Sequence, residues 1–196
     1  MNPERRAIAD EIYALGVEFD AQQSHRLARL RNLEPETAEL LAVLARAACA
    51  RRILEVGTSN GYSTLWLADA ASVTGGHVES LDIDPRRSEQ ACDNIARAGL
   101  DGLATCRTVS AAQALGEYPD DAWDLIFLDA ERPEYASYWP NVRRTLAPGG
   151  MLVIDNASSH AAELTDVSRL LHADPRMTTV VVPIGAGLIV SLDGDA

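Results

Sequence analysis

From residue 52 onward, the sequence alternates short apolar runs with segments long enough to form helices. The apolar runs occupy residues 52–56, 78–81, 104–109, 125–128 and 151–154. This alternation is typical of parallel strands joined by crossover helices. Two further runs, 178–183 and 188–192, flank Gly185-Ala186-Gly187, which predicts an antiparallel hairpin. The expected fold is therefore α/β, with a mostly parallel sheet and an antiparallel C-terminal edge.

Two helices are expected before the first strand. The apolar residues Ile8, Ile12, Leu15 and Phe19 recur at spacings of three and four, which predicts an amphipathic helix over residues 3–33. A second helix is predicted over residues 35–47, with proline in its first turn. At 196 residues, 47% of them hydrophobic, the chain has the length of one domain. We expect a single domain, 1–196, in which an N-terminal helical segment, 1–47, precedes an α/β core, 48–196.

Composition excludes several classes of function. The net charge of −12 opposes binding to nucleic acid and to anionic membrane surfaces, which are recognised through clustered basic residues. All 17 basic residues are arginine, so a Schiff base, a P-loop lysine and a lysine general base are excluded. Cys49, Cys92 and Cys106 form no C-x-x-C pair, which argues against disulfides and zinc. The sequence has no signal-like segment and no membrane-spanning run, and we expect a cytoplasmic protein.

A strand, a glycine-containing turn and the start of a helix follow one another between residues 53 and 64. Gly57 and Gly61 allow the backbone of the turn to approach a ligand without a Cβ clash. The helix start near Ser63 offers free N–H groups to a carboxylate. The G-x-x-x-G spacing differs from the G-x-G-x-x-G of dinucleotide sites, which disfavours a nicotinamide-dependent oxidoreductase. Glu55, just before the first glycine, suits the amino group of a methionine moiety.

A second acidic residue supports the same ligand. Asp82 closes the next strand, about twenty residues beyond the turn, where an acid can accept hydrogen bonds from both hydroxyls of a ribose. The alternative is that Asp82 and Asp84 are solvated turn residues, with Asp84-Pro85 forming the cap and first turn of a helix.

Three oxygen-bearing residues end two of the apolar runs. Asp129 follows the run at 125–128, and Asp155 and Asn156 follow the run at 151–154. The carboxyl ends of parallel strands meet at one edge of a sheet, so these side chains are expected to lie together. Two carboxylates and an amide oxygen suit a hard cation such as Mg²⁺ or Mn²⁺. The alternative is that both aspartates merely terminate strands and Asn156 lies in a turn.

These motifs resemble the small class I O-methyltransferases, the family that includes catechol and caffeoyl-CoA O-methyltransferases. The resemblance covers residues 33–192. Residues 55–63 resemble the family's S-adenosylmethionine motif, residues 123–130 resemble its fourth strand with an acidic metal ligand, and residues 151–156 resemble its fifth strand with an Asp-Asn metal pair. The resemblance implies a Rossmann-like, seven-stranded sheet with six parallel strands and one reversed strand, and helices on both faces.

The motifs and the resemblance together give the candidate site residues. Residues 110–112 stand where the family brackets the adenine of the cofactor. The expected cofactor-binding residues are Glu55, Gly57, Ser59, Gly61, Ser63, Asp82, Ala111 and Asp129, and the expected metal ligands are Asp129, Asp155 and Asn156.

The chain departs from the family at the catalytic lysine. In the family a lysine stands three residues after the fourth-strand aspartate, whereas this sequence has Arg132 there. A guanidinium keeps its proton, so Arg132 can stabilise a phenolate but cannot serve as the base. Either the metal alone lowers the pKa of the acceptor, or His160, four residues after Asn156, acts as the base. The alternative for His160 is an exposed loop position without a role.

We therefore expect a methyltransferase that moves a methyl group from S-adenosylmethionine to a hydroxyl of a small, phenolic acceptor held by a divalent metal. A metal-independent methyltransferase and a catalytically silent S-adenosylmethionine-binding protein are the alternatives. Full activity after chelation would favour the first, and binding without turnover the second. The N-terminal helix and the hairpin edge are candidate surfaces for a homodimer, which the family resemblance also implies.

Overall fold

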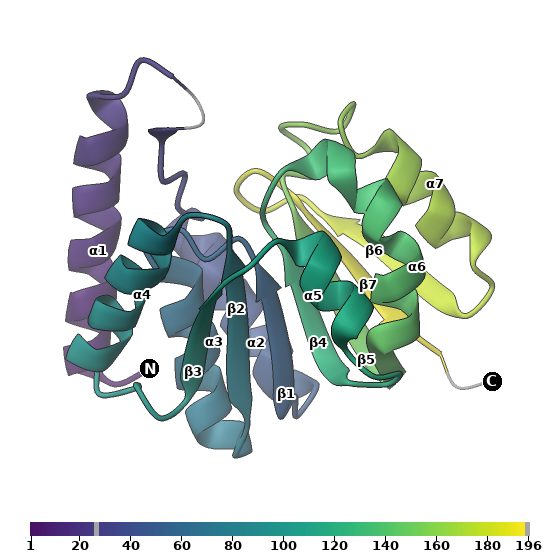
Figure 1. Cartoon of the computed structure of the whole chain (residues 1–196), viewed down its shortest axis with the longest axis horizontal. Helices are drawn as coiled ribbons and strands as arrows, with labels where there is room; N and C mark the ends of the chain where they lie inside the picture. Colours follow the sequence, from purple (N-terminus) through teal and green to yellow (C-terminus); the bar gives the residue numbers. More distant parts are fainter. Residues whose placement is uncertain (26–27, 195–196) are drawn as a thin grey trace.

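A seven-stranded sheet forms the centre of the molecule (Figure 1). The structure is a computed structural model and describes residues 1–25 and 28–194. The strands are β1 (Arg52–Val56), β2 (His77–Asp82), β3 (Ala104–Thr108), β4 (Trp123–Leu128), β5 (Leu146–Asp155), β6 (Met177–Val182) and β7 (Leu188–Asp193). Their order is β3-β2-β1-β4-β5-β7-β6. Strand β7 runs antiparallel to β5 and β6, whereas the other neighbouring strands pair in parallel. The predicted sheet with one reversed strand and a C-terminal hairpin is confirmed.

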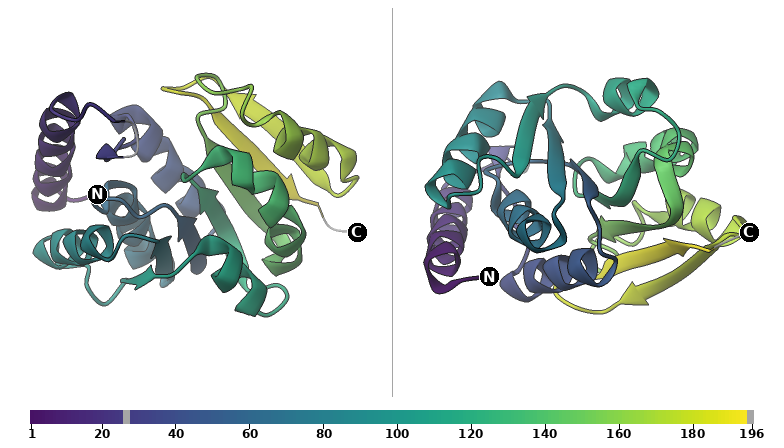
Figure 2. Two further views of the ribbon diagram at one scale, coloured as in Figure 1. Left: turned by 45° about the horizontal axis from the view of Figure 1, so that its top comes forward. Right: turned by 90° about the horizontal axis from the view of Figure 1, so that it is seen from below.

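Helices cover both faces of the sheet, as the two further views in Figure 2 show. The helices are α1 (Pro3–Ala21), α2 (Pro35–Ala47), α3 (Tyr62–Thr74), α4 (Pro85–Arg97), α5 (Ala111–Glu117), α6 (Tyr135–Thr145) and α7 (Thr165–Ala173), and a 3-10 turn, η2 (Arg132–Glu134), precedes α6. Helices α1 to α4 contribute to the core on one face, and α5 to α7 to the core on the other. The predicted helix over residues 35–47 is confirmed.

The central strands are apolar on both sides, which explains their continuous hydrophobic runs. Ile53 and Phe127 belong to the core on the α3 side, whereas Leu54 and Ile126 belong to the core on the α6 side. Successive strand residues point to opposite faces, so each central strand supplies both layers. This alternation also determines which way a polar residue inside a strand points.

Helix α1 is shorter than predicted, because it ends at Ala21 rather than near residue 33. The carboxylate of Asp20 accepts hydrogen bonds from the backbone N–H groups of Leu30 (2.6 Å) and Arg31 (2.8 Å). These bonds draw the chain back toward the end of the helix. Residues 28–33, called the strap below, are therefore not part of α1, and residues 26–27 of the predicted helix lie outside the described residues.

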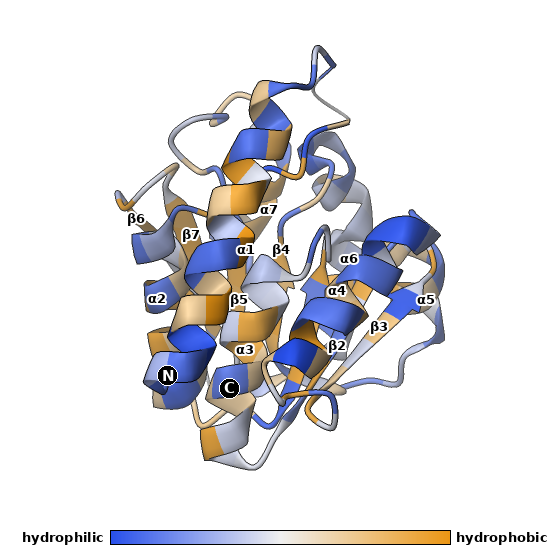
Figure 3. Cartoon of the chain, turned by 90° about the vertical axis from the view of Figure 1, so that its left-hand side faces the viewer, coloured by the Kyte–Doolittle hydropathy of each residue, from blue (hydrophilic) through white to orange (hydrophobic). Residues whose placement is uncertain are grey.

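The outer side of α1 keeps several apolar residues. Figure 3 looks onto this helix, along which hydrophilic and hydrophobic residues alternate. Ile12 is buried, whereas Leu15, Val17 and Phe19 are exposed. The apolar pattern predicted for this segment therefore contributes to the core only in part. None of the helices in the described ranges combines the length and the apolarity that a membrane crossing requires.

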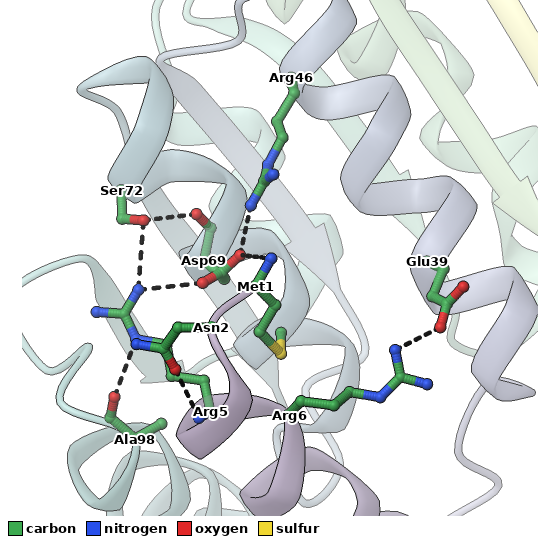
Figure 4. Close-up of polar contacts among 9 residues, drawn as sticks. All are labelled: Met1, Asn2, Arg5, Arg6, Glu39, Arg46, Asp69, Ser72 and Ala98. Atoms are coloured by element: carbon green, nitrogen blue, oxygen red, sulfur yellow. Dashed lines mark hydrogen bonds and ion pairs between the residues drawn. The ribbon is translucent and has the colours of Figure 1, made fainter.

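A buried carboxylate joins the first three helices (Figure 4). Asp69 of α3 is 2% exposed and forms ion pairs with Arg5 of α1 (3.0 Å) and Arg46 of α2 (2.5 Å). The amino group of Met1 lies 3.4 Å from the same carboxylate. Buried charges are normally paired in this way, because an unpaired one loses its hydration without compensation. The cluster fixes α1 and α2 against the helix that begins at the glycine-containing turn.

Candidate active site

A cavity of about 540 Å³ opens at the carboxyl ends of strands β1 to β4. Its wall includes residues 56–59, 81–84, 109–112 and 129–131, which follow these four strands, and Tyr62 and Ser63 at the start of α3. Residues 30–33 of the strap also line it. In open α/β sheets, ligands bind outside the carboxyl ends of the strands, and this volume is typical of small-molecule sites. The cavity is therefore the candidate active site.

The turn after β1 brings its backbone to the cavity through glycine. Gly57 has a φ of +108°, and a Cβ there would lie 2.0 Å from the carbonyl oxygen of Asp129. Gly61 has a φ of +83°, and its Cβ would lie 2.9 Å from the Cα of Ala91. Gly57 lines the cavity, whereas Gly61 packs against α4 and is not part of the wall. Gly61 therefore fixes the start of α3 against α4, and its contact with a cofactor stays a prediction.

Glu55 lies behind the cavity rather than in its wall. Its side chain is fully buried, and its carboxylate accepts hydrogen bonds from the hydroxyls of Ser63 (2.5 Å), Ser80 (2.5 Å) and Thr64. Burial raises the pKa of Glu55 to about 7, although these three hydrogen bonds act in the opposite direction. Glu55 is not among the wall residues, so its direct contact with a methionine amino group stays a prediction that this geometry does not favour. Glu55 instead joins β1 and β2 to the first turn of α3.

Asp82 lies in the cavity wall, where the sequence predicted a ligand-binding acid. One of its oxygens accepts a hydrogen bond from the backbone N–H of Ser59 (2.9 Å), and the other from that of Asp84 (2.9 Å). The hydroxyl of Ser59 donates to the carbonyl of Leu30 in the strap (2.9 Å). The structure therefore brings together the turn after β1, the end of β2 and the strap.

Apolar residues complete this half of the cavity. Ala111 lies in the wall, as predicted, together with its neighbours in the turn after β3. Ile83 also lies there and is 76% exposed, so its side chain offers an apolar surface to the cavity. Ligand pockets commonly combine such surfaces with a few polar groups. The sequence analysis missed Ile83, although an isoleucine between two turn aspartates was a usable signal.

The strand-end residues Asp129, Asp155 and Asn156 gather at the ends of β4 and β5. Asp129 lies in the cavity wall, whereas Asp155 and Asn156 lie behind it. The amide nitrogen of Asn156 donates to Oδ2 of Asp155 (2.6 Å), while Oδ1 of Asp155 is buried and finds no hydrogen-bond partner within residues 1–25 and 28–194. Burial raises the pKa of both aspartates, and the negative charge of Asp129 raises that of Asp155 further. These two buried carboxylates form an acidic cluster, called the acidic edge below.

Arg132 partly offsets this charge from behind the cavity wall. Its side chain is 3% exposed; Nε donates to Glu163 (2.8 Å) and Nη1 donates to Oδ1 of Asn156 (2.7 Å). Its positive charge lowers the pKa of Asp129 and of Asp155, against the larger effect of burial. Arg132 is not among the wall residues, so a direct contact with a bound acceptor stays a prediction that this geometry does not favour.

His160 also lies outside the cavity wall. It belongs to the turn after β5, where its Nδ1 is 2.9 Å from the hydroxyl of Ser159 and its backbone N–H donates to the carbonyl of Asn156 (3.0 Å). This arrangement matches the loop position considered as the alternative for His160. A role as general base stays a prediction that this geometry does not favour.

The strap is the part of the site that the sequence analysis missed. Leu30, Arg31 and Leu33 line the cavity, although they were assigned to a helix. Arg31 reaches across to Glu131 after β4, with Nη2 3.3 Å from Oε1. Their placement depends on Asp20, whose contact with the strap has no local sequence signal.

Comparisons with known proteins agree with this geometry. The chain matches the family model described as O-methyltransferase over residues 11–193. It is 31% identical over 173 residues to a protein from Mycolicibacterium vanbaalenii described as a candidate O-methyltransferase, a match that covers 81% of this chain and 76% of that protein. It is 36% identical over 128 residues to a catechol O-methyltransferase from Niastella koreensis, which covers 64% of this chain and 58% of that protein.

A solved structure shares the fold over almost the whole chain. The O-methyltransferase from Bacillus cereus, determined in complex with SAH, superposes with a TM-score of 0.80 at 25% identity, covering 95% of this chain and 90% of that one. The family model includes the turn after β1 and the ends of β4 and β5, where the candidate site residues lie. The chain therefore belongs to the O-methyltransferase family.

Proposed function

We propose that the protein transfers a methyl group from S-adenosylmethionine to a hydroxyl oxygen of a small, phenolic acceptor. One observation carries this proposal: a single cavity connects the glycine turn and Asp82 with the acidic edge at Asp129. The relatives support it, since one is named a catechol O-methyltransferase and one was determined with SAH. In the reaction, the acceptor oxygen forms a bond to the methyl carbon while the bond from that carbon to the sulfonium sulfur breaks, so that S-adenosylhomocysteine (SAH) leaves and the hydroxyl proton passes to solvent.

The cofactor is assigned to the half of the cavity formed by β1, β2 and β3. Gly57 leaves room for close approach, and the first turn of α3 near Ser63 offers free N–H groups to the carboxylate of the methionine part. Asp82 can accept hydrogen bonds from ribose hydroxyls while it stays bonded to Ser59. Ile83 and Ala111 provide apolar walls for the adenine ring.

A divalent cation fits the acidic edge. The donor set would be Asp129, Asp155 and the amide of Asn156. It contains only two carboxylates, and residues 1–25 and 28–194 hold no group of three or more His, Cys, Asp or Glu that could bind a metal. The unpartnered Oδ1 of Asp155 and the raised pKa of both aspartates support this assignment, because a cation would satisfy the oxygen and favour the charged forms. Oxygen donors suit Mg²⁺ or Mn²⁺. When bound, such a cation stabilises the anion of a phenol.

The protein's own groups orient this edge. The hydroxyl of Tyr135, a fully buried residue, accepts a hydrogen bond from the backbone N–H of Ala130 and so fixes the chain just after Asp129. Arg132 holds the amide of Asn156 with its oxygen toward the guanidinium and its nitrogen toward Asp155. These contacts keep the acidic groups in place before any ligand arrives, which reduces the cost of ordering them.

One observation favours a second candidate, a metal-independent methyltransferase. The guanidinium of Arg132 already donates to the Asn156 oxygen that the cation would need. In this version the positive charge at the edge comes from Arg132 alone, and Asp129 and Asp155 are structural.

The test measures methyl transfer from labelled S-adenosylmethionine to catechol, with Mg²⁺ and after exhaustive chelation. The proposal expects transfer that is lost on chelation, restored by Mg²⁺ and reduced at least about a hundredfold in Asp155→Asn. Asp166→Asn, an exposed change on α7, is the matched control and should behave as wild type. Full activity after chelation would establish the metal-independent candidate. S-adenosylmethionine binding with no transfer to any hydroxyl acceptor would refute both.

A further inference from the structure

Two arginines approach the acidic edge of the cavity, and they differ in what their side chains can reach. Arg132 is buried behind the wall and bonded to Glu163 and Asn156. Arg31 lies in the wall itself, opposite Glu131. A ligand that enters the cavity at this edge therefore meets Arg31 rather than Arg132.

The backbone of the strap holds Arg31 in an uncommon conformation. Its φ of +54° lies in the left-handed region, which a residue with a long side chain seldom adopts. The carboxylate of Asp20 stabilises it by accepting hydrogen bonds from two successive N–H groups, those of Leu30 and Arg31. Strained residues held by their surroundings are often found at ligand sites. Here the result is that the side chain of Arg31 faces the cavity.

The guanidinium of Arg31 has unused hydrogen-bonding capacity. Its side chain is 32% exposed, and its contact with Glu131, at 3.3 Å, is longer than a typical charged hydrogen bond. Its Nε is buried and has no hydrogen-bond partner among the described residues. An arginine presents five N–H donors in a planar fork that matches the two oxygens of a carboxylate. The contact with Glu131 uses only Nη2, so the partly exposed guanidinium keeps further donors for a ligand carboxylate.

The position of Arg31 places such a ligand at the acceptor end. Arg31 and Asp129 line the same cavity. Glu131, the ion-pair partner of Arg31, also lies in this wall and stands two residues after Asp129. The Arg31 guanidinium thus lies beside the edge to which the acceptor hydroxyl is assigned.

We propose that Arg31 binds a carboxylate carried by the acceptor, so that the preferred substrates are hydroxylated aromatic acids rather than neutral phenols. This inference rests on the proposed function for the location of the acceptor. The methionine part of the cofactor also carries a carboxylate, and the experiment separates the two sources.

The experiment measures binding by calorimetry to the full chain loaded with SAH, in buffer containing Mg²⁺. The ligands are 3,4-dihydroxybenzoate and its neutral isostere 3,4-dihydroxybenzamide, which share the two hydroxyls and differ in charge. The proteins are wild type, Arg31→Gln and Glu131→Gln, with Arg29→Gln as the matched control. Arg29 lies on the same strap but is exposed and outside the cavity wall.

The expected result is that wild type and Arg29→Gln bind the benzoate at least about tenfold more tightly than the benzamide. Arg31→Gln should bring this ratio close to one, while the affinities for the benzamide and for SAH change less than about threefold. Glu131→Gln should keep or enlarge the ratio, because it removes the competing carboxylate and leaves the guanidinium charged.

Other outcomes would overturn the proposal. Weaker SAH binding in Arg31→Gln with an unchanged ratio would assign Arg31 to the cofactor carboxylate. If Arg31→Gln and Glu131→Gln each lost the same affinity for the benzoate as for the benzamide, the ion pair between Arg31 and Glu131 would serve only to hold the strap in place. Wild-type protein that binds neither ligand, or both equally, would contradict it as well. A failure of the proposed function can be told apart from these outcomes, because methyl transfer would be absent while the ratio of the two binding affinities could still be measured.

Discussion

Nη1 of Arg132 donates a hydrogen bond to Oδ1 of Asn156 over 2.7 Å, which joins the turn after β4 to the end of β5. The same guanidinium binds Glu163 through Nε. Arg132, which stands at the position of the family lysine, therefore uses its guanidinium to bind Asn156 and Glu163 behind the cavity wall. Its contribution to stability and to activity can be separated by mutation.

Arg132→Met should destabilise the protein by about 2–3 kcal/mol, because it removes the hydrogen bond to the Asn156 oxygen and the ion pair with Glu163. Breaking a fully buried ion pair costs about 3–5 kcal/mol, and Glu163 is partly exposed, so the lower value is expected. Urea denaturation measures the loss. Arg169→Met, which breaks an exposed pair with Asp166, is the control and should cost less than about 0.5 kcal/mol. Equal small losses in both variants would show that the Arg132 network adds nothing to stability.

Asp69→Asn should destabilise the packing of α1 and α2 on α3. The buried carboxylate pairs with Arg5 and Arg46, and its neutral replacement leaves both cations without an ionic partner. We expect a loss of about 3 kcal/mol, at the lower end for a buried pair because the arginines are partly exposed. Asp10→Asn, in an exposed pair with Arg6, should change stability by less than about 0.5 kcal/mol. A Tm for Asp69→Asn within a degree or so of wild type would contradict this account.

Glu55 should make stability depend on pH in the direction opposite to that of a salt-bridged acid. Burial raises its pKa from 4.5 to about 7, so the folded protein holds this proton more tightly than the unfolded chain. The free energy of unfolding should therefore fall as pH rises from about 4.5 to 7, by at most ~3 kcal/mol from this group, and then level off.

Glu55→Gln isolates that contribution, because Asp129 and Asp155 titrate in both proteins. The measurement is the difference in unfolding free energy between pH 5 and pH 8, taken for wild type and for the variant. The fall should be smaller in Glu55→Gln. Identical pH dependence in the two proteins would mean that Glu55 is already ionised in the folded protein at pH 5.

Gly57→Ala should damage both the fold and the site. The new Cβ would meet the backbone carbonyl of Asp129, which cannot move without shifting the end of β4, and the residue would keep a φ of +108°. We expect a loss of about 2 kcal/mol or more in stability, together with at least tenfold weaker binding of S-adenosylmethionine. Gly116→Ala in α5 is the control, because nothing lies within 4 Å of its Cβ and alanine favours a helix. Wild-type binding by Gly57→Ala would show that the turn adjusts.

Local patterns were enough to predict the sheet and the acidic edge. Apolar runs determine where strands begin and end, and the shared direction of β4 and β5 brings Asp129 and Asp155 to one edge. The side of the sheet toward which the Glu55 side chain points could also have been predicted. Ile53 faces the α3 side, and Glu55, two residues later on the same strand, must face it too. The prediction of a direct ligand contact for Glu55 did not make use of this alternation.

The remaining parts of the site depend on contacts between distant residues. Arg31 reaches the cavity because Asp20, eleven residues earlier, binds its backbone N–H. Arg132 turns inward because Glu163, 31 residues later, accepts its Nε. Neither contact follows from periodicity or from the type of neighbouring residues. The motif that placed Arg132 near Asp129 therefore gave its position in the chain but not its orientation.

The strap contacts both halves of the cavity, through Leu30 with Ser59 on one side and through Arg31 with Glu131 on the other. A ligand that moved the strap in one half would therefore change what a second ligand meets in the other half. Binding energies coupled in this way are reciprocal, so a factor by which the first ligand strengthened binding of the second would equal the factor by which the second strengthened binding of the first. Residues 28–33 would then link the two affinities.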